Sequence, residues 1–185
     1  MTAELVTRAQ AGDHAAFSAL AAASVSRLHR IARLILRDEE FARDAVQEAL
    51  VNAWLDIKAV RDPERFDAWL HRLLVRACYR EADRHRRRRV VEITIQPMEL
   101  PDPGDSPHEL AIRDLLERGF RQLTPEHRAV LVVRHYLGLA DEEAAGALGV
   151  APGTFKSRLH RATAALRAAV EADERAPQGA RESMV

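Results

Sequence analysis

The chain has 185 residues, of which 47% are hydrophobic and 30% are charged, and its formal net charge at pH 7 is zero. This length and composition suit one medium domain or two small ones. The single cysteine, Cys78, excludes an internal disulfide and favours a reducing compartment. No apolar run reaches the length of a membrane span, and the first twelve residues have no apolar leader core. We therefore expect a cytoplasmic protein without membrane insertion.

The first half of the chain predicts four helices that form one compact domain over residues 1–90. Three of these helices start after an aspartate, whose side chain can accept a hydrogen bond from the first helical turn. These aspartates are Asp13, Asp38 and Asp62. Apolar residues recur at three- and four-residue spacing after each of them, which indicates one buried face per helix. Gly12 ends the short first helix, because glycine tolerates the positive φ of a helix stop.

The middle of the chain is rich in proline and acidic residues. Four prolines and a glycine lie between residues 96 and 107, so this stretch cannot be a helix. Residues 90–117 hold seven acidic side chains and one arginine. We expect an acidic linker over 91–107, a second helical domain over 108–170 and a disordered tail over 171–185. The predicted fold is all-α, with two small helical domains joined by a flexible linker.

The predicted fourth helix carries a ridge of arginines. Eight arginines lie between residues 69 and 89, against only Glu81 and Asp83. Four of them recur every four residues and therefore share one helix face: Arg72, Arg76, Arg80 and Arg84. Such a ridge neutralises phosphates and gives affinity without sequence information. The alternative is a solvated face paired with acids, but two acids are too few to pair the ridge, so we predict phosphate contact.

Residues 141–161 have the pattern of two short helices joined by a tight turn. Gly149 stands where the turn requires positive φ, and Pro152 suits the first turn of the next helix. In that next helix the apolar residues form one buried stripe: Phe155, Leu159, Ala162 and Leu166. Small polar and donor groups share another face: Lys156, Ser157, His160 and Arg161. Because such groups bind base edges and phosphates in a major groove, the pattern predicts a DNA-binding helix-turn-helix rather than an ordinary helical hairpin.

No set of residues predicts catalysis, a metal site or a cofactor. His127 and His135 are eight residues apart on a predicted helix, about two turns, which is too far to share a metal. Cys78 and His71 form a lone pair, which we interpret as one core and one surface residue. A glycine-rich loop for phosphates is also missing from the sequence. We therefore expect a protein that is not an enzyme and binds no cofactor.

The order of these features resembles the extracytoplasmic-function (ECF) group of the sigma-70 family of bacterial RNA polymerase sigma factors. The first domain resembles sigma region 2 in the motifs FSAL at 17–20, ARDAVQE at 42–48 and FDAWL at 66–70. The second resembles region 4 in GTFKSRLHRA at 153–162. The resemblance covers about residues 17–167, and both motif sets occur in the family's order.

The resemblance implies partners and roles by position. The implied partners are core RNA polymerase, through its beta-prime clamp and beta subunit, promoter DNA and an anti-sigma factor. The segment that docks on the clamp helices matches Asp44, Gln47 and Glu48. The loop over 58–65 and the arginine-rich helix after it match the part that reads the melted −10 element. The readers of the −35 element match Lys156, Ser157, Arg158, His160 and Arg161. The acidic linker matches the connector that lies near the RNA path.

The chain also departs from the family pattern. Arg43 stands where the family often has an acid, Arg76 where an asparagine is common, and Ala140 at the usual Ser or Thr cap. Few exposed aromatic residues are expected to stack on bases, so we predict weak promoter melting and strict promoter choice.

The function predicted from the sequence is a sigma factor that directs promoter-specific initiation through −10 and −35 recognition. One alternative is a stand-alone dimeric helix-turn-helix regulator, in which the acidic linker and the face from Asp44 to Glu48 would have no role. Another is an adaptor that binds only protein, and the arginine ridge argues against it.

Overall fold

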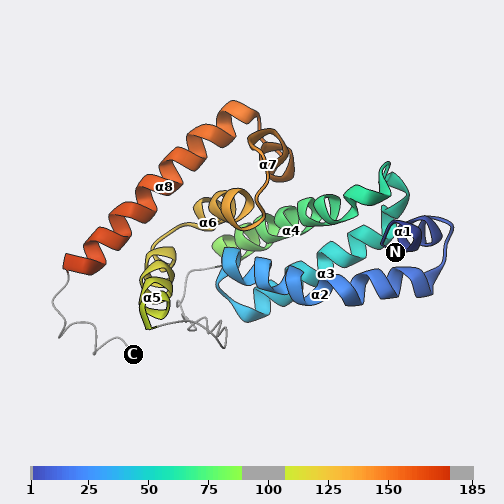
Figure 1. The fold of residues 1–185 in the computed structure, drawn as a ribbon, viewed down its shortest axis with the longest axis horizontal. Helices are drawn as coiled ribbons and strands as arrows, with labels where there is room; N and C mark the ends of the chain where they lie inside the picture. The colour runs from blue at the N-terminus through green and yellow to red at the C-terminus, as the bar shows by residue number, and fades with distance from the viewer. Residues whose placement is uncertain (1, 89–106, 176–185) are drawn as a thin grey trace.

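The computed structural model describes residues 2–88 and 107–175, and every regular element in these ranges is helical (Figure 1). This confirms the predicted all-α class. The first half contains α1 (Thr2–Gln10), α2 (His14–Leu36), α3 (Glu39–Leu55) and α4 (Phe66–Arg88), with two short 3-10 turns at Ile57–Ala59 and Pro63–Arg65. The second half contains α5 (Pro107–Arg121), α6 (Pro125–Leu131), a π-helical turn at Val132–Tyr136, α7 (Asp141–Leu148) and α8 (Pro152–Arg175).

The predicted aspartate caps are confirmed. The Asp13 side chain accepts a hydrogen bond from the backbone N–H of Ala16, and the Asp38 side chain accepts one from Phe41, both at 3.0 Å. Asp62 caps the 3-10 turn before α4 in the same way. Each bond satisfies an N–H group that has no partner within its own helix, which fixes where the element begins.

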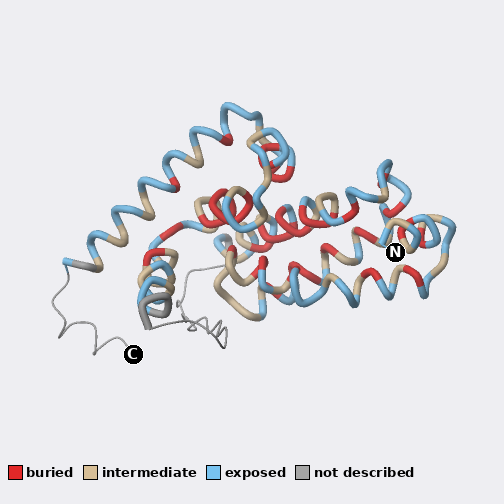
Figure 2. Tube along the Cα trace, in the orientation of Figure 1, coloured by how far each residue is buried: buried red, intermediate tan, exposed pale blue. Residues whose placement is uncertain are grey.

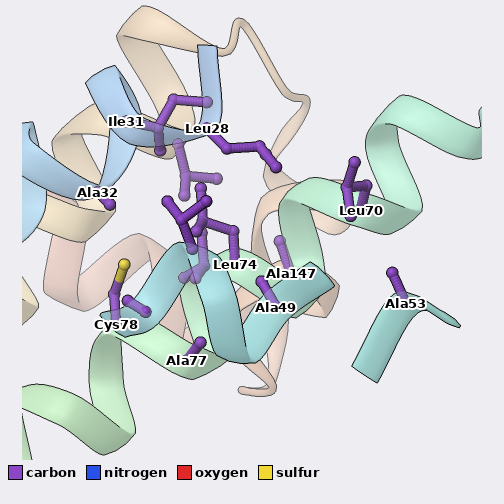
Figure 3. Packing of buried hydrophobic residues seen from close by; sticks show 14 of the residues in the cluster. Leu28, Ile31, Ala32, Ala49, Ala53, Leu70, Leu74, Ala77, Cys78 and Ala147 are labelled. Atoms are coloured by element: carbon purple, nitrogen blue, oxygen red, sulfur yellow. The ribbon is translucent and has the colours of Figure 1, made fainter. Parts of the chain in front are cut away.

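The core of the first half is built from α2, α3 and α4, which lie side by side (Figures 1 and 3). Helix α3 contributes a row of fully buried alanines, so its neighbours can approach closely. These alanines are Ala42, Ala45, Ala49 and Ala53. Larger side chains from the flanking helices fill the remaining space, among them Leu28 and Ile31 of α2 and Leu74 of α4. Burial of these apolar side chains is the main stabilising contribution to this half.

In the second half, α8 packs along one face against α7, α6 and α5. Gly119 of α5 lies so close to α8 that an added Cβ would come within 2.9 Å of Leu166 and 3.0 Å of Val170. The predicted stripe of α8 is confirmed: Phe155 and Ala162 are fully buried, and Leu159 packs against the core. Most of the remaining length of α8 is exposed (Figure 2). The helix therefore presents a long exposed surface on its other faces.

The two halves contact each other. Helix α7 packs on α4 and α6 packs on α2, so one continuous buried cluster includes residues of both halves. Ala147 of α7 lies in this cluster with Leu74 of α4 (Figure 3). Arg128 of α6 is buried as well, and its Nε donates to the Ile35 carbonyl at the end of α2, at 2.6 Å.

One helix changes type, and one boundary differs from expectation. The helix after Thr124 changes to a π-helical turn before Gly138, which has a φ of +66°. Helix α8 continues to Arg175, past the expected end of the second domain at 170. The linker core and most of the tail, residues 89–106 and 176–185, lie outside the described residues. Within the described ranges, no helix is long and apolar enough to span a membrane.

Candidate nucleic-acid interface

Helices α7 and α8 form the predicted tight turn. Gly149 adopts a left-handed conformation, with φ of +67° and ψ of +33°, and ends α7. The backbone N–H of Val150 donates back to the Ala145 carbonyl at 3.0 Å, which closes the turn. Pro152 is the first residue of α8. Phe155 is completely buried beneath the turn and fixes the angle at which α8 leaves it.

The predicted polar face of α8 is exposed. Lys156, Ser157, His160 and Arg161 are all exposed, and no ion pair to them occurs among the described residues. The Arg161 Nε donates to the Ser157 carbonyl one turn earlier at 3.3 Å, so the guanidinium lies along its own helix. These donors and charges are therefore available to an external anion such as a DNA phosphate.

Arg158 lies apart from this face, although the sequence grouped it with the same readers. It is half-buried and reaches Tyr79 of α4. Burial raises the pKa of the Tyr79 phenol to about 12, while the nearby Arg158 guanidinium opposes this rise. Arg158 therefore belongs to the contact between the two halves in this arrangement.

The start of α7 lacks a side-chain cap from Ala140, as the sequence suggested. Glu143 compensates in part, because its carboxylate accepts from the Ala140 backbone N–H at 3.4 Å. The same carboxylate lies 3.5 Å from Arg65, just before α4, and so links the two halves.

The arginine ridge of α4 has the predicted geometry, but part of it is paired with acidic side chains, which was not predicted. Its four arginines are exposed. However, the Glu48 carboxylate of α3 pairs with Arg80 at 2.6 Å and with Arg84 at 3.2 Å. Glu81 pairs with Arg84 at 2.8 Å. The expectation that acids are too few to pair the ridge is therefore wrong for its second half. No ion pair to Arg72 or Arg76 occurs in the described parts of the chain.

The three residues of α3 that were predicted to dock on the polymerase clamp do not all point the same way. Asp44 and Gln47 are exposed, while Glu48 is half-buried and turns toward α4. Gln47 lies on the rim of an apolar groove of about 450 Å³ between α2 and α3. The groove is lined mainly by Phe17, Val25, Val46, Leu50, Val51 and Trp54. Val25 is 41% exposed and Val51 is 52% exposed, so this apolar surface is open to solvent.

Comparison with known proteins places these surfaces in a family. The model of "Sigma-70 region 2" matches residues 20–88, and the model of "Sigma-70, region 4" matches residues 113–166. The chain is 36% identical over 165 residues to the ECF RNA polymerase sigma factor SigM of Mycobacterium tuberculosis, covering 89% of this chain and 82% of that protein. The chain belongs to the ECF group of the sigma-70 family.

Other relatives agree with this assignment. The RNA polymerase sigma-E factor of Streptomyces avermitilis is 36% identical over 146 residues, covering 78% of this chain and 79% of that protein. The solved structure of CnrH in complex with the cytosolic domain of CnrY has a TM-score of 0.61 and 29% identity, covering 93% of this chain and 98% of that one. The sigma factor RpoE of Bartonella quintana, solved with the anti-sigma factor NepR, shares the fold, with a TM-score of 0.60 and 22% identity over 85% of this chain and 98% of that one.

In this sigma factor, region 2 corresponds to α2–α4 and region 4 to α5–α8. One expectation within region 2 is wrong: His71 is buried, only 5% exposed, rather than at the surface. Burial, and to a smaller extent the nearby Arg27, lower its pKa to about 4. Cys78 is buried as expected, and burial raises its pKa. Among the described residues, no group of three or more metal-ligating side chains is close enough to hold an ion.

Sequence reasoning missed the groove and the buried Arg128. Phe17, Leu50 and Trp54 line the groove and are only partly covered. The groove could have been found from Val25 and Val51, two apolar residues that lie outside the main buried stripe of their helices. No local signal indicated Arg128, because its partners are backbone carbonyls in other elements.

Proposed function

We propose that this sigma factor binds core RNA polymerase and directs promoter-specific initiation, with region 4 on the −35 duplex and region 2 on the −10 element. The observation that supports this most directly is the exposed polar face of α8, carried by a helix-turn-helix and free of acidic partners within the described residues. The match of both family models and the ECF relatives support the same function.

The −35 element is read by Lys156, Ser157, His160 and Arg161 in the major groove. A well-placed bidentate contact from arginine to guanine contributes about 1–3 kcal/mol of base discrimination. Arg158 joins these readers only after it leaves Tyr79 of region 2. The number of available −35 contacts therefore depends on whether the two regions touch.

The −10 side combines the loop before α4 with the ridge. Arg72 and Arg76 supply phosphate contacts directly, whereas Arg80 and Arg84 first exchange their carboxylate partners for phosphates. Lys58 and Arg61 in the loop are exposed and add positive charge near the melted strand.

The two regions must separate when both elements are read together. The elements lie roughly 25 base pairs apart, which is about 85 Å of B-form DNA. In this structure α7 packs directly on α4. The described arrangement is therefore that of the free sigma factor, and promoter binding requires region 4 to leave region 2.

The face with Asp44 and Gln47, together with the apolar groove beside it, binds the polymerase clamp. An open apolar groove between two helices suits an apolar helix face of a partner, and the polar rim orients that partner. Glu48 contributes by holding Arg80 and Arg84 in place. An anti-sigma factor is a further partner, in keeping with the RpoE structure that was solved with the anti-sigma factor NepR.

The domain division follows from the same roles: residues 1–90 as region 2, 91–107 as linker, 108–170 as region 4 and 171–185 as tail. The family matches fall within these bounds and support them. The protein acts on the polymerase in the cytoplasm as an initiation factor and performs no catalysis of its own.

Run-off transcription with purified core polymerase tests the proposal. Templates that carry the −10 and −35 sequences upstream of the protein's own target operon are compared with templates mutated in either element. We expect a defined start that requires both elements and that falls sharply with a mismatched −10 sequence. Absence of any start on a panel of such promoters, combined with tight dimeric binding to a palindrome, would support the regulator alternative instead.

A further inference from the structure

A cavity of about 540 Å³ lies where the two regions meet. Its region 2 wall is formed by the residues between α2 and α3 and by the last turns of α4, and its region 4 wall by the end of α5 and the start of α6. The volume is in the range of small-molecule sites, which commonly lie between domains. A ligand in this cavity would contact both regions at once.

Buried hydrogen-bond donors that have no partner among the described residues line this cavity. The Arg37 side chain is only 6% exposed, and its Nη2 donates to the Glu117 carboxylate at 3.2 Å. The Nε and Nη1 atoms of Arg37 are buried, and neither has a hydrogen-bond partner in the described ranges. Arg121 donates to the same oxygen of Glu117 at 3.1 Å, and its Nε is likewise buried and unpaired within these ranges. One carboxylate thus serves two guanidinium groups, which leaves donors that a further anion would satisfy.

The backbone at Arg37 is also unusual. Arg37 is the only residue other than glycine with a positive φ in the described ranges, at 58°. This left-handed conformation is uncommon for a side-chain-bearing residue and persists where the surrounding structure enforces it. It turns the chain between α2 and α3, where Arg37 lines the cavity.

On the lining of the cavity itself, positive charge exceeds negative charge. Four guanidinium groups line it: Arg37, Arg86, Arg121 and Arg128. Two carboxylates lie on the lining, Asp38 and Glu126, and two more pair with the lining arginines: Glu117 with Arg37 and Arg121, and Asp83 with Arg86. Asp38 is already committed to capping α3. Burial lowers the pKa of Arg37 and lowers that of Arg128 to about 10, because the charged forms are poorly solvated there.

The remaining lining is apolar and aromatic. The rings of Phe41 and His85 lie in contact, with centroids 4.3 Å apart. Leu36, Leu123 and Pro125 add apolar surface. A ligand that fits both parts carries a flat ring system for the aromatic wall and a multiply charged anionic group for the arginines.

We propose that this cavity binds a nucleoside di- or triphosphate, with its phosphates on Arg37 and Arg121 and its base against Phe41 and His85. Because the site is formed by both regions, the bound nucleotide holds region 4 on region 2 and disfavours the separated form. This regulatory consequence rests on the proposed sigma-factor function, whereas the binding itself does not. By linkage, a nucleotide that prefers the closed form weakens polymerase binding.

Binding is tested on the full-length chain alone, by calorimetry with ADP and GDP as probes and with adenosine and inorganic pyrophosphate as partial probes. We expect one nucleotide per chain, bound at least about tenfold more tightly than adenosine, because charge-assisted bonds to arginine require the phosphates. Pyrophosphate binding as tight as that of both nucleotides would overturn the assignment of the base. No saturable binding of either nucleotide would overturn the site.

Variants locate the site. Arg121→Gln removes one buried unpaired donor, and we expect it to weaken nucleotide binding about tenfold or more. Arg30→Gln is the matched control, since Arg30 is exposed on α2 and lies outside the cavity lining. Equal weakening by both variants would indicate nonspecific attraction to positive charge and would contradict the proposal. Far-UV circular dichroism and melting temperature of each variant, measured without nucleotide, establish that both variants are folded.

The regulatory step is tested by binding of labelled sigma factor to core polymerase with and without ADP, which is not a substrate for RNA synthesis. We expect ADP to weaken polymerase binding of the natural chain and of Arg30→Gln, but not of Arg121→Gln. Unchanged binding in the presence of saturating ADP would overturn the regulatory consequence. Because calorimetry uses neither polymerase nor DNA, a failure of the sigma-factor function would appear in the polymerase assay alone.

Discussion

The two basic surfaces of this sigma factor differ in what surrounds their charges. On α4, Arg80 and Arg84 are held by Glu48 and Glu81, so half of the ridge is already paired. On α8, the exposed face around Arg161 has no acidic partner among the described residues. A paired arginine must give up its carboxylate before it binds a phosphate, whereas an unpaired one gives up only water.

This difference predicts a division of labour. The α8 face contributes most per residue to DNA affinity and carries the base contacts. The second half of the α4 ridge contributes little net affinity, and its pairing fixes the side chains in one orientation. The first half of the ridge, with Arg72 and Arg76, resembles the α8 face in lacking ion pairs within the described residues.

The largest expected effect comes from removing the buried side chain that supports the exposed polar face of α8. Phe155→Ala deletes a fully buried ring beneath the turn and should lower the free energy of unfolding by about 3–5 kcal/mol. Denaturant unfolding measures this change, and −35 binding should fall with it. Phe155→Leu is the control that retains most of the volume. An equal loss in both variants would show that the shape of the aromatic ring, and not the buried volume, supports the turn.

The dependence of folding stability on pH tests the environment of a buried histidine in α4. His71 of α4 is buried, and its pKa is lowered to about 4, below its unfolded value near 6.5. Between these values the unfolded chain binds more protons, so stability should fall as pH falls from about 6.5 to 4, by at most about 1.4 kcal/mol per pH unit. His71→Leu should flatten this dependence. The same slope in the variant would assign it to other groups.

Single arginine substitutions compare the two surfaces directly. Arg161→Ala should weaken binding to −35 DNA by about 1–3 kcal/mol if it makes a bidentate base contact. Arg84→Ala removes the same charge from the paired surface and should change holoenzyme binding to promoter DNA much less. Quantitative footprinting of the −35 and −10 elements with polymerase holoenzyme separates the two effects. Equal losses from both variants would refute the division of labour.

Glu48→Gln reduces the difference between the two surfaces, because it frees Arg80 and leaves Arg84 paired with Glu81 alone. We expect promoter affinity to rise at low salt, and the plot of log affinity against log salt to become steeper by about one to two units. Glu40→Gln makes the same charge change at an exposed site of α3 and serves as the control. Binding to core polymerase is measured separately, because Glu48 lies beside the proposed clamp surface. An unchanged salt slope would mean that these arginines do not reach phosphates.

The smallest expected effect concerns the helix before the turn. Gly146 is exposed within α7, and an added Cβ meets no atom within 4 Å. Gly146→Ala should stabilise the fold by about 0.4–1 kcal/mol without altering DNA binding. Gly119→Ala is the informative contrast, since its Cβ would press on Leu166 at 2.9 Å and should destabilise the fold. Thermal unfolding of both variants checks the opposite signs.

The features predicted correctly from the sequence are local ones. The caps at Asp13 and Asp38 and the turn at Gly149 depend on residues within a few positions of each other. Helical spacing likewise placed the exposed polar face of α8 on the side opposite Phe155. Such features follow from backbone geometry and capping chemistry, which adjacent residues determine.

Some of the features that the sequence did not predict depend on partners that are distant in the chain. Another was misjudged because it was inferred from the residue type alone. Glu48 lies 32 positions before Arg80, so no count of nearby acids could include it. His71 was assigned to the surface because histidine is often exposed, although it precedes Leu74 by three and Cys78 by seven positions, which is the spacing of the buried face. The contact of α7 with α4 depends on how two helical units meet, which no single helix pattern specifies.

Arg128 has a consequence for how readily the molecule changes shape. Its guanidinium donates to Ile35 at the carboxyl end of α2 and to Leu123 just after α5, at 2.6 and 2.7 Å, and so neutralises the partial negative charge of two helix ends. When the regions part, water can solvate both the carbonyls and the guanidinium. The alanines of α7 bury little area each, so their own apolar contribution to this contact is also small. The joint between the regions is therefore suited to repeated opening and closing in which neither helical unit unfolds.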